Sequence, residues 1–256
     1  MRRVRVIPVL LVSNRRLIKT IKFKDEVYVG DPINAIKIFN DKEVDELLVL
    51  DISATPQARG PNMELIKDIA DECFMPLGYG GGINTPEEIK SILNAGVEKV
   101  ILNTSAYRKS ELITQGADTF GSQSIVVSID VRKNMFGKYV IHVNSGNDKV
   151  SVPLIEYCQN VQELGAGEIV INSINNDGIQ SGYDQKLIKM VSDSVSIPVV
   201  ACGGATSIDD FRDAILSSGA SAVAAGSMFV FKGKHRAVLI NYPAQSILEN
   251  NLYSKL

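Results

Sequence analysis

Short apolar runs alternate along the chain with segments whose apolar residues recur about every 3.6 positions. The runs are nearly continuous in apolar character, which is typical of parallel strands covered on both faces. The helical spacing is clear in MELIKDIADEC and PEEIKSILNAG, and helices are expected to begin at Thr85 and Ser207, each followed by acidic residues. The expected strands are Val4–Val12, Leu47–Ile52, Met75–Ile83, Lys99–Thr104, Ile125–Val131, Glu168–Ile174, Pro198–Ala205 and Ala222–Ser227. Eight such units predict either a closed barrel or a doubly wound open sheet.

The two halves of the chain resemble each other at an offset of about 122 residues. PLGYGGGINTPEEI, from Pro76, aligns with PVVACGGATSIDDF, from Pro198, and Glu46 falls on Glu168. An open sheet gives no reason for such a register, whereas two (β/α)4 halves related by a pseudo-twofold axis do. The sequence therefore predicts one α/β domain over residues 1–256, a (β/α)8 TIM barrel with halves at about 1–121 and 122–256. Its 256 residues agree with the usual size of that fold, about 250 residues.

Composition narrows the class of partner. The net charge of −2 gives no basic field, so neither a nucleic acid nor a membrane is an expected partner. The three cysteines are widely spaced and form no zinc-binding pattern with the two histidines, so no metal or other cofactor is expected. The apolar N-terminal run is short and lacks a cleavage site, and no run approaches the ~18 residues of a membrane span. We expect a cytoplasmic protein with free thiols.

Glycine-rich turns end strands at matching places in the two halves. In a barrel of this kind the functional site lies at the carboxyl ends of the strands, where glycines let backbone N–H groups approach an anion. Each half is therefore expected to provide one phosphate cradle. The alternative is that the glycines only make tight turns, and the matched hydroxyl and amide side chains favour phosphate. The predicted cradle residues are Gly80, Gly81, Gly82, Asn103 and Thr104 in the first half, and Gly203, Gly204, Gly226 and Ser227 in the second.

Two carboxylates follow apolar strand runs and are candidates for acid–base chemistry. Asp51 ends the second strand and Asp130 ends the fifth. Asp177 and Gly178 follow the sixth strand and either contact the ligand or only shape a turn. Lys19 falls in a long polar loop after the first strand, where a solvated charge is the simplest interpretation.

Four charged residues stand at or near the starts of strands, at the opposite end of the barrel. They are Arg5, Glu46, Lys99 and Glu168, from the first, second, fourth and sixth strands. They could pair as a ring across the barrel bottom, either as surface salt bridges or as a plug that controls entry to the barrel axis. The spacing alone favours the surface interpretation.

Several motifs resemble the cyclase subunit of imidazole glycerol phosphate synthase across nearly the whole chain. That family is a duplicated (β/α)8 barrel whose substrate carries two phosphates. The resemblance implies that a glutaminase subunit docks on the barrel bottom and that ammonia travels along the axis. The motifs are GDP at Gly30–Pro32, DEL at Asp45–Leu47, LDI at Leu50–Ile52, GGGI at Gly80–Ile83, LITQGADTFGSQSIVVSID from Leu112, SGYD from Ser181 and CGGA from Cys202.

The resemblance assigns roles to particular residues. The four bottom charges match the family's ammonia gate one for one, Asp130 matches one of its two catalytic aspartates, and Lys19 matches its substrate-binding lysine. The second aspartate is replaced by Leu11, where the family reads CLDVKDG and this chain reads VLLVSNR. Leucine transfers no proton, and acid–base help is typically worth about 10²–10⁴-fold, so ring closure by the usual two-acid route is not expected.

A paralogous branch of this family also lacks the aspartate that Leu11 replaces here. The chain is similar to this branch in IPxLL at Ile7–Leu11, in FKD at Phe23–Asp25 with YVGDPINA at Tyr28–Ala35, and in HRAVLINYP at His235–Pro243. Similarity to this branch implies amidation of surface-glycan sugars, which forms acetamidino groups. It also implies two partners, a dedicated glutaminase and a third, sugar-modifying amidotransferase. The expected function is therefore an ammonia-channelling synthase subunit with a phosphorylated substrate. Two alternatives stay open: the histidine-pathway cyclase itself, and a non-catalytic scaffold that binds a phosphorylated ligand and conducts ammonia.

Overall fold

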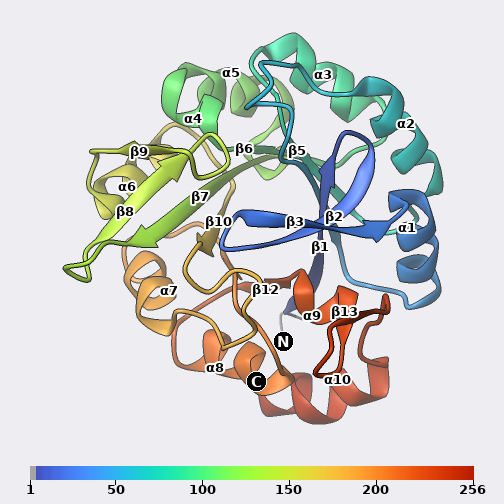
Figure 1. Cartoon of the computed structure of the whole chain (residues 1–256). Helices are drawn as coiled ribbons and strands as arrows, with labels where there is room; N and C mark the ends of the chain where they lie inside the picture. Colours follow the sequence, from blue (N-terminus) through green and yellow to red (C-terminus); the bar gives the residue numbers. More distant parts are fainter. Residues whose placement is uncertain (1–3) are drawn as a thin grey trace.

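Eight parallel strands close into a barrel, seen along its axis in Figure 1. The computed structural model describes residues 4–256. The barrel strands are β1 (Arg5–Ser13), β4 (Leu47–Asp51), β5 (Leu77–Gly80), β6 (Lys99–Leu102), β7 (Ile125–Lys133), β10 (Glu168–Ser173), β11 (Val199–Cys202) and β12 (Ala222–Ala225). Their order is β10-β11-β12-β1-β4-β5-β6-β7, and β7 also pairs with β10. The ring of pairings confirms the predicted (β/α)8 barrel and excludes the open sheet.

Helices cover the outside of the barrel (Figure 1). Two of them, α3 and α8, begin where the sequence predicted, because Thr85 and Ser207 each form a reciprocal capping box with the acid three residues later. The helices are α1 (Pro32–Asp41), α2 (Met63–Glu72), α3 (Pro86–Asn94), α4 (Thr104–Arg108), α5 (Glu111–Phe120), α6 (Leu154–Glu163), α7 (Gln185–Ser192), α8 (Ile208–Leu216), α9 (Ser227–Val230) and α10 (Gln245–Asn251), with 3₁₀ turns η1 (Ser122–Ser124) and η2 (Tyr253–Lys255).

Alternation along the strands divides the apolar residues into two cores. On β1, Val6, Leu10 and Val12 point outward into the core between barrel and helices, whereas Ile7 and Val9 point inward. The inner core fills the barrel between its two ends. It consists of Ile7, Val9, Leu11, Ile18, Leu48, Ile101, Val126, Val170, Val200, Ala222 and Ala224, with Leu50, Ile52 and Cys202 packed against them.

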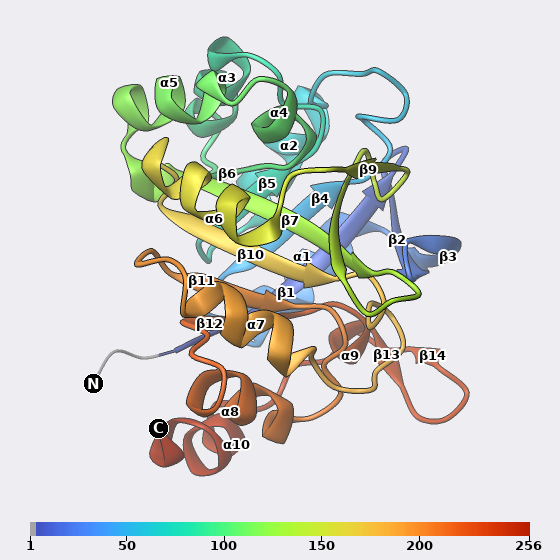
Figure 2. The same cartoon turned by 90° about the vertical axis from the view of Figure 1, so that its left-hand side faces the viewer.

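Antiparallel hairpins extend two of the barrel strands beyond the barrel. The extensions are β2 (Arg16–Ile21) with β3 (Lys24–Gly30) on β1, and β8 (Tyr139–Val143) with β9 (Asp148–Val150) on β7. A shorter hairpin, β13 (Phe231–Lys232) with β14 (Ala237–Val238), follows β12. All three project from one end of the barrel (Figure 2). The expectation of a loop after the first strand was wrong, because residues 16–21 form a strand that pairs with β1 through residues 16–18.

The matching extensions on β1 and β7 fit the expected half-barrels, whose duplication stays a prediction. No helix within residues 4–256 is long and apolar enough to cross a membrane.

Candidate functional site

A pocket opens at the carboxyl ends of the barrel strands, beneath the hairpins. The tertiary structure brings together every residue that the sequence predicted for substrate binding or catalysis, although these residues lie up to about 200 positions apart. The predicted residues that line the pocket are Lys19, Asp51, Gly82, Asn103, Thr104, Asp130, Asp177, Gly178, Gly203, Gly204, Gly226 and Ser227. Their functional roles stay proposals.

Asp130, on β7, is a buried carboxylate held by two amides. Asn103 donates from Nδ2 to Oδ2 at 3.0 Å, and Asn172 donates from Nδ2 to Oδ1 at 3.3 Å. Burial, and to a lesser degree the nearby Asp177, raise the pKa of Asp130 to about 7 against the opposing effect of the two amides. A carboxyl group with a pKa near neutrality can both give and take a proton at physiological pH.

Asn172 was missed by the sequence reasoning. It is the second-last residue of β10 and lies directly beside Asp130 in the strand pairing. The repeat offset that places Glu46 on Glu168 also places Leu50 on Asn172, and this change from apolar to polar could have identified it. Its Oδ1 atom is buried and has no hydrogen-bond partner within residues 4–256, so it offers a free acceptor inside the pocket.

Lys19 lies on β2 and is only 3% exposed, so the interpretation as a solvated loop charge was wrong. Its ammonium group lies against Gly226, where a Cβ atom would overlap it. Next to Gly226, the Ser227 hydroxyl is buried and has no partner in the described part of the chain. The second-half cradle therefore combines a buried cation with a free hydroxyl, both of which suit an anion.

The glycine pairs are required by the turns themselves. Gly81 and Gly82 have φ values of 127° and 72°, and a Cβ atom at Gly82 would lie 2.6 Å from the Arg59 carbonyl oxygen. Gly203 and Gly204 have φ values of 87° and 117°. These glycines thus have a structural role, and anion binding would be additional to it.

Thr104 differs from its predicted role as a free donor. Its hydroxyl accepts a hydrogen bond from the Asn144 backbone N–H at 2.8 Å and donates to Asn103 Oδ1 at 3.3 Å. A hydroxyl committed in both directions offers little to a ligand. The first-half cradle therefore has fewer free side-chain donors than the second.

Asp51 organises the turn after β4. Its Oδ1 atom accepts hydrogen bonds from Ser53 N at 3.0 Å, Ser53 Oγ at 2.7 Å and Ala54 N at 3.1 Å. With one oxygen occupied three times, Asp51 is a weaker acid–base candidate than Asp130.

Asp177 and Gly178 fasten the β2–β3 hairpin over the pocket. The Thr20 hydroxyl donates to Asp177 Oδ2 at 3.3 Å, and Lys22 N–H donates to the Asp177 carbonyl at 3.0 Å. A Cβ atom at Gly178 would overlap the Thr20 carbonyl. Burial raises the pKa of Asp177, and the nearby Lys19 opposes the rise. The turn interpretation thus accounts for both residues, whose place in the pocket wall also allows contact with a ligand.

Leu11 stands at the pocket end of β1, where it is 8% exposed and lines the pocket. Its neighbours in the strand pairing are Leu50 on β4 and Ile18 on β2. This side of the pocket consequently offers no proton donor or acceptor at the position that corresponds to Asp130.

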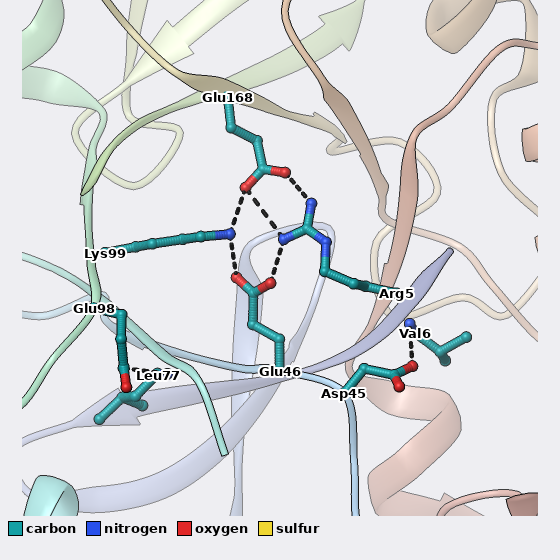
Figure 3. A network of polar contacts seen from close by, with 8 residues as sticks. All are labelled: Arg5, Val6, Asp45, Glu46, Leu77, Glu98, Lys99 and Glu168. Carbon is teal, nitrogen blue, oxygen red and sulfur yellow. Dashed lines mark hydrogen bonds and ion pairs between the residues drawn. The ribbon is translucent and has the colours of Figure 1, made fainter. Parts of the chain in front are cut away.

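At the opposite end of the barrel, the four predicted charges form one network (Figure 3). Arg5 binds both Glu46 and Glu168, and Lys99 Nζ lies 2.9 Å from Glu46 and 3.0 Å from Glu168. Glu46 is 2% exposed and Glu168 is 6% exposed. The surface interpretation was therefore wrong, and the ring closes across the axis. Between this ring and Asp130 the inward-facing side chains are almost all apolar.

No group of three or more metal-ligating His, Cys, Asp or Glu side chains lies together within residues 4–256.

Comparison with known proteins places these features in context. The family described as "Histidine biosynthesis protein" matches residues 5–236. The chain is 53% identical to "Putative imidazole glycerol phosphate synthase subunit hisF2" of Pseudomonas aeruginosa, over 93% of this chain and 95% of that protein. It is 49% identical to "Putative imidazole glycerol phosphate synthase subunit hisF3" of Vibrio vulnificus, over 96% of this chain and 95% of that protein. It is 39% identical to "Imidazole glycerol phosphate synthase subunit HisF" of Alkaliphilus metalliredigens, over 88% and 89%.

Proposed function

We propose that this chain is the ammonia-conducting synthase subunit of a glutamine amidotransferase complex. The chain belongs to the histidine biosynthesis protein family and, within it, to the cyclase subunits of imidazole glycerol phosphate synthase. The observation that carries the proposal is the closed ring of Arg5, Glu46, Lys99 and Glu168, joined to the Asp130 pocket by an apolar barrel interior.

The ring and the interior suit ammonia for a physical reason. An apolar barrel interior opposes ions, because an ammonium ion would lose its hydration without compensation, whereas neutral ammonia is small and uncharged. Two carboxylates that share two cations have alternative pairings, so one cation can swing aside while the other still contacts both. Such a ring can admit ammonia at the barrel bottom while each carboxylate keeps a cationic partner.

The proposed partner is a glutaminase that docks over the ring, with the exposed Glu98 at its rim. The proposed substrate is a phosphorylated small molecule in the pocket, where Lys19 and Ser227 favour an anion. The loss of an acid at Leu11, with the ring kept, supports amidation of a surface-glycan sugar rather than ring closure. A third, sugar-modifying amidotransferase belongs to that proposal.

Coexpression with a class-I glutaminase encoded beside the gene tests the partner. We expect a stable heterodimer on size exclusion that is weakened by Glu98→Lys and unaffected by Lys189→Glu, an exposed change on α7. Absence of association would contradict the proposed complex. A heterodimer that binds no phosphorylated compound would contradict the proposed substrate class, and one that binds ligand without converting it would favour the scaffold alternative.

The second candidate is the histidine-pathway cyclase, and Asp130 is the observation that favours it. That carboxyl group, with a pKa of about 7 and two amide partners, retains half of the expected acid–base pair. The names of the relatives, which are those of imidazole glycerol phosphate synthase subunits, also favour this candidate. Restoration of growth to a histidine auxotroph that lacks its own cyclase would establish this candidate.

A further inference from the structure

The order of the barrel strands separates the two glycine cradles by two different walls. One cradle lies at the ends of β5 and β6, and the other lies at the ends of β11 and β12. Around the barrel, β1 and β4 lie between the cradles on one side, and β7 and β10 lie between them on the other. A ligand held by both cradles would therefore present one face to each wall.

The two walls occupy equivalent positions but have opposite chemistry. In the β1–β4 pairing Leu11 lies beside Leu50, and in the β7–β10 pairing Asp130 lies beside Asn172. All four side chains line the pocket. Ile52 also lines the apolar side, at the end of β4.

Each wall favours a different kind of ligand group. A hydroxyl or amide of the ligand placed on Leu11 and Leu50 would lose hydration and find no partner. The same group facing Asp130 and Asn172 would meet a titratable carboxyl and the unpartnered Asn172 Oδ1. An alkyl group that packs on Leu11 and Leu50 gains the free energy of transfer out of water and gives up no hydrogen bond.

We infer that Leu11, Leu50 and Ile52 form an alkyl subsite, and that the physiological ligand carries a small alkyl or acyl substituent on that side. The inference rests on the proposed function, because it assumes an anion in a cradle. It adds that the ligand has one apolar side, toward β1 and β4, and one side with hydrogen-bonding groups, toward β7 and β10. A polyhydroxylated chain without an apolar substituent would fit this pocket poorly.

A series of phosphate esters tests the subsite without knowledge of the natural ligand. Inorganic phosphate and methyl, ethyl, propyl and butyl phosphate would be titrated into the whole chain and followed by NMR. We expect each methylene that reaches the wall to lower Kd by about two- to fourfold, fourfold being the value for complete burial. In Leu11→Asn, which is similar in size but polar, the gain per methylene should vanish.

Two further variants control for side effects of the change. Leu11→Met keeps the wall apolar and should keep the gain, as should Leu216→Asn, a change at a 57% exposed position on α8. If Leu11→Asn does not fold, Leu50→Asn serves in its place. Affinity that does not change along the series in the unmodified chain, or an undiminished gain in the polar variants, would overturn the subsite. Failure of every ester and of phosphate to bind would instead overturn the proposed substrate class, and the subsite with it.

Discussion

The ammonium group of Lys19 rests on the backbone of Gly226, although the two residues belong to opposite halves of the chain. Lys19 reaches this position from the β2–β3 hairpin, and Gly226 directly follows β12. The absence of a side chain at Gly226 makes the space that the lysine occupies. The hairpin thereby delivers a buried cation to the second-half cradle.

Gly226→Ala should displace Lys19 and weaken anion binding. The backbone at Gly226 has an ordinary negative φ of −109°, so alanine adds no strain there, and the lysine tip can move. We expect phosphate affinity to fall about tenfold, as for the loss of one charge-assisted hydrogen bond of about 1.5 kcal/mol. The measurement is a phosphate titration of both proteins.

The double variant separates this cause from general damage. In a Lys19→Met background, Gly226→Ala should cost little more, since the group that it displaces is already gone. Additive losses would show that Gly226 acts independently of Lys19.

Two anions should bind at the strand ends when crystals are soaked in sulfate. One is expected near Gly82 and Asn103, the other near Gly204 and Ser227. The second should appear at the lower sulfate concentration, because it has Lys19 and a free hydroxyl, whereas Thr104 in the first is already bonded to Asn144. Two empty positions at high sulfate would argue against both cradles.

Lys99→Met should destabilise the fold. Removing one partner from a buried ion pair usually costs about 3–5 kcal/mol. Here Arg5 still binds both glutamates and Lys99 is 20% exposed, so we expect a decrease of about 1–3 kcal/mol in the free energy of unfolding. Urea denaturation measures the change.

The matched control is Lys189→Met, which removes an exposed i,i+4 pair with Asp193. Its effect should stay within about 0.5 kcal/mol. Equal effects of the two variants would mean that the ring contributes no more than a surface pair.

Stability should depend on pH through Asp130. Its folded pKa of about 7 exceeds the ordinary value of 3.8, so the folded state holds this proton more tightly than the unfolded chain. Its contribution is therefore fully present below about pH 4 and is lost as the pH rises to about 7. Relative to Asp130→Asn, the protein should lose about 2–3 kcal/mol of unfolding free energy between pH 5 and pH 8.

Urea denaturation of both proteins across that range gives the difference directly. Asp25→Asn, at an exposed carboxylate, serves as the control and should follow the unmodified protein. A constant difference between Asp130→Asn and the unmodified protein would show that Asp130 titrates outside this window.

The chain should convert the ribulosyl intermediate of histidine biosynthesis negligibly, even when saturating ammonium salt replaces the glutaminase. Without an acid at Leu11, turnover should fall at least 10²-fold, or about 2.7 kcal/mol of barrier. Loss of the substrate's near-ultraviolet absorbance measures the rate.

Leu11→Asp should restore a trace of this activity at most, because Ser13 also departs from the CLDVKDG pattern of the family. Rapid turnover by the unmodified chain would mean that another group supplies the proton. The histidine-pathway function would then replace the glycan proposal.

The sequence by itself determined the barrel, because its signals are local or repeated. Apolar runs mark strands wherever they pack, and capping residues such as Thr85 act within one turn of helix. The repeat also determined which strand ends carry Asp130 and the glycines, and the resemblance identified the ring of Arg5, Glu46, Lys99 and Glu168.

Only the tertiary structure decided how those residues are used, because the deciding contacts join distant segments. Lys19 is buried because its hairpin brings it against Gly226, just after β12, and the Thr104 hydroxyl is engaged because Asn144 reaches it from the β8–β9 loop. Asp130 acquires its raised pKa from burial, which no local pattern specifies. The contrast between the two pocket walls likewise depends on strand order, since Leu11 meets Leu50 only where the barrel places β1 beside β4.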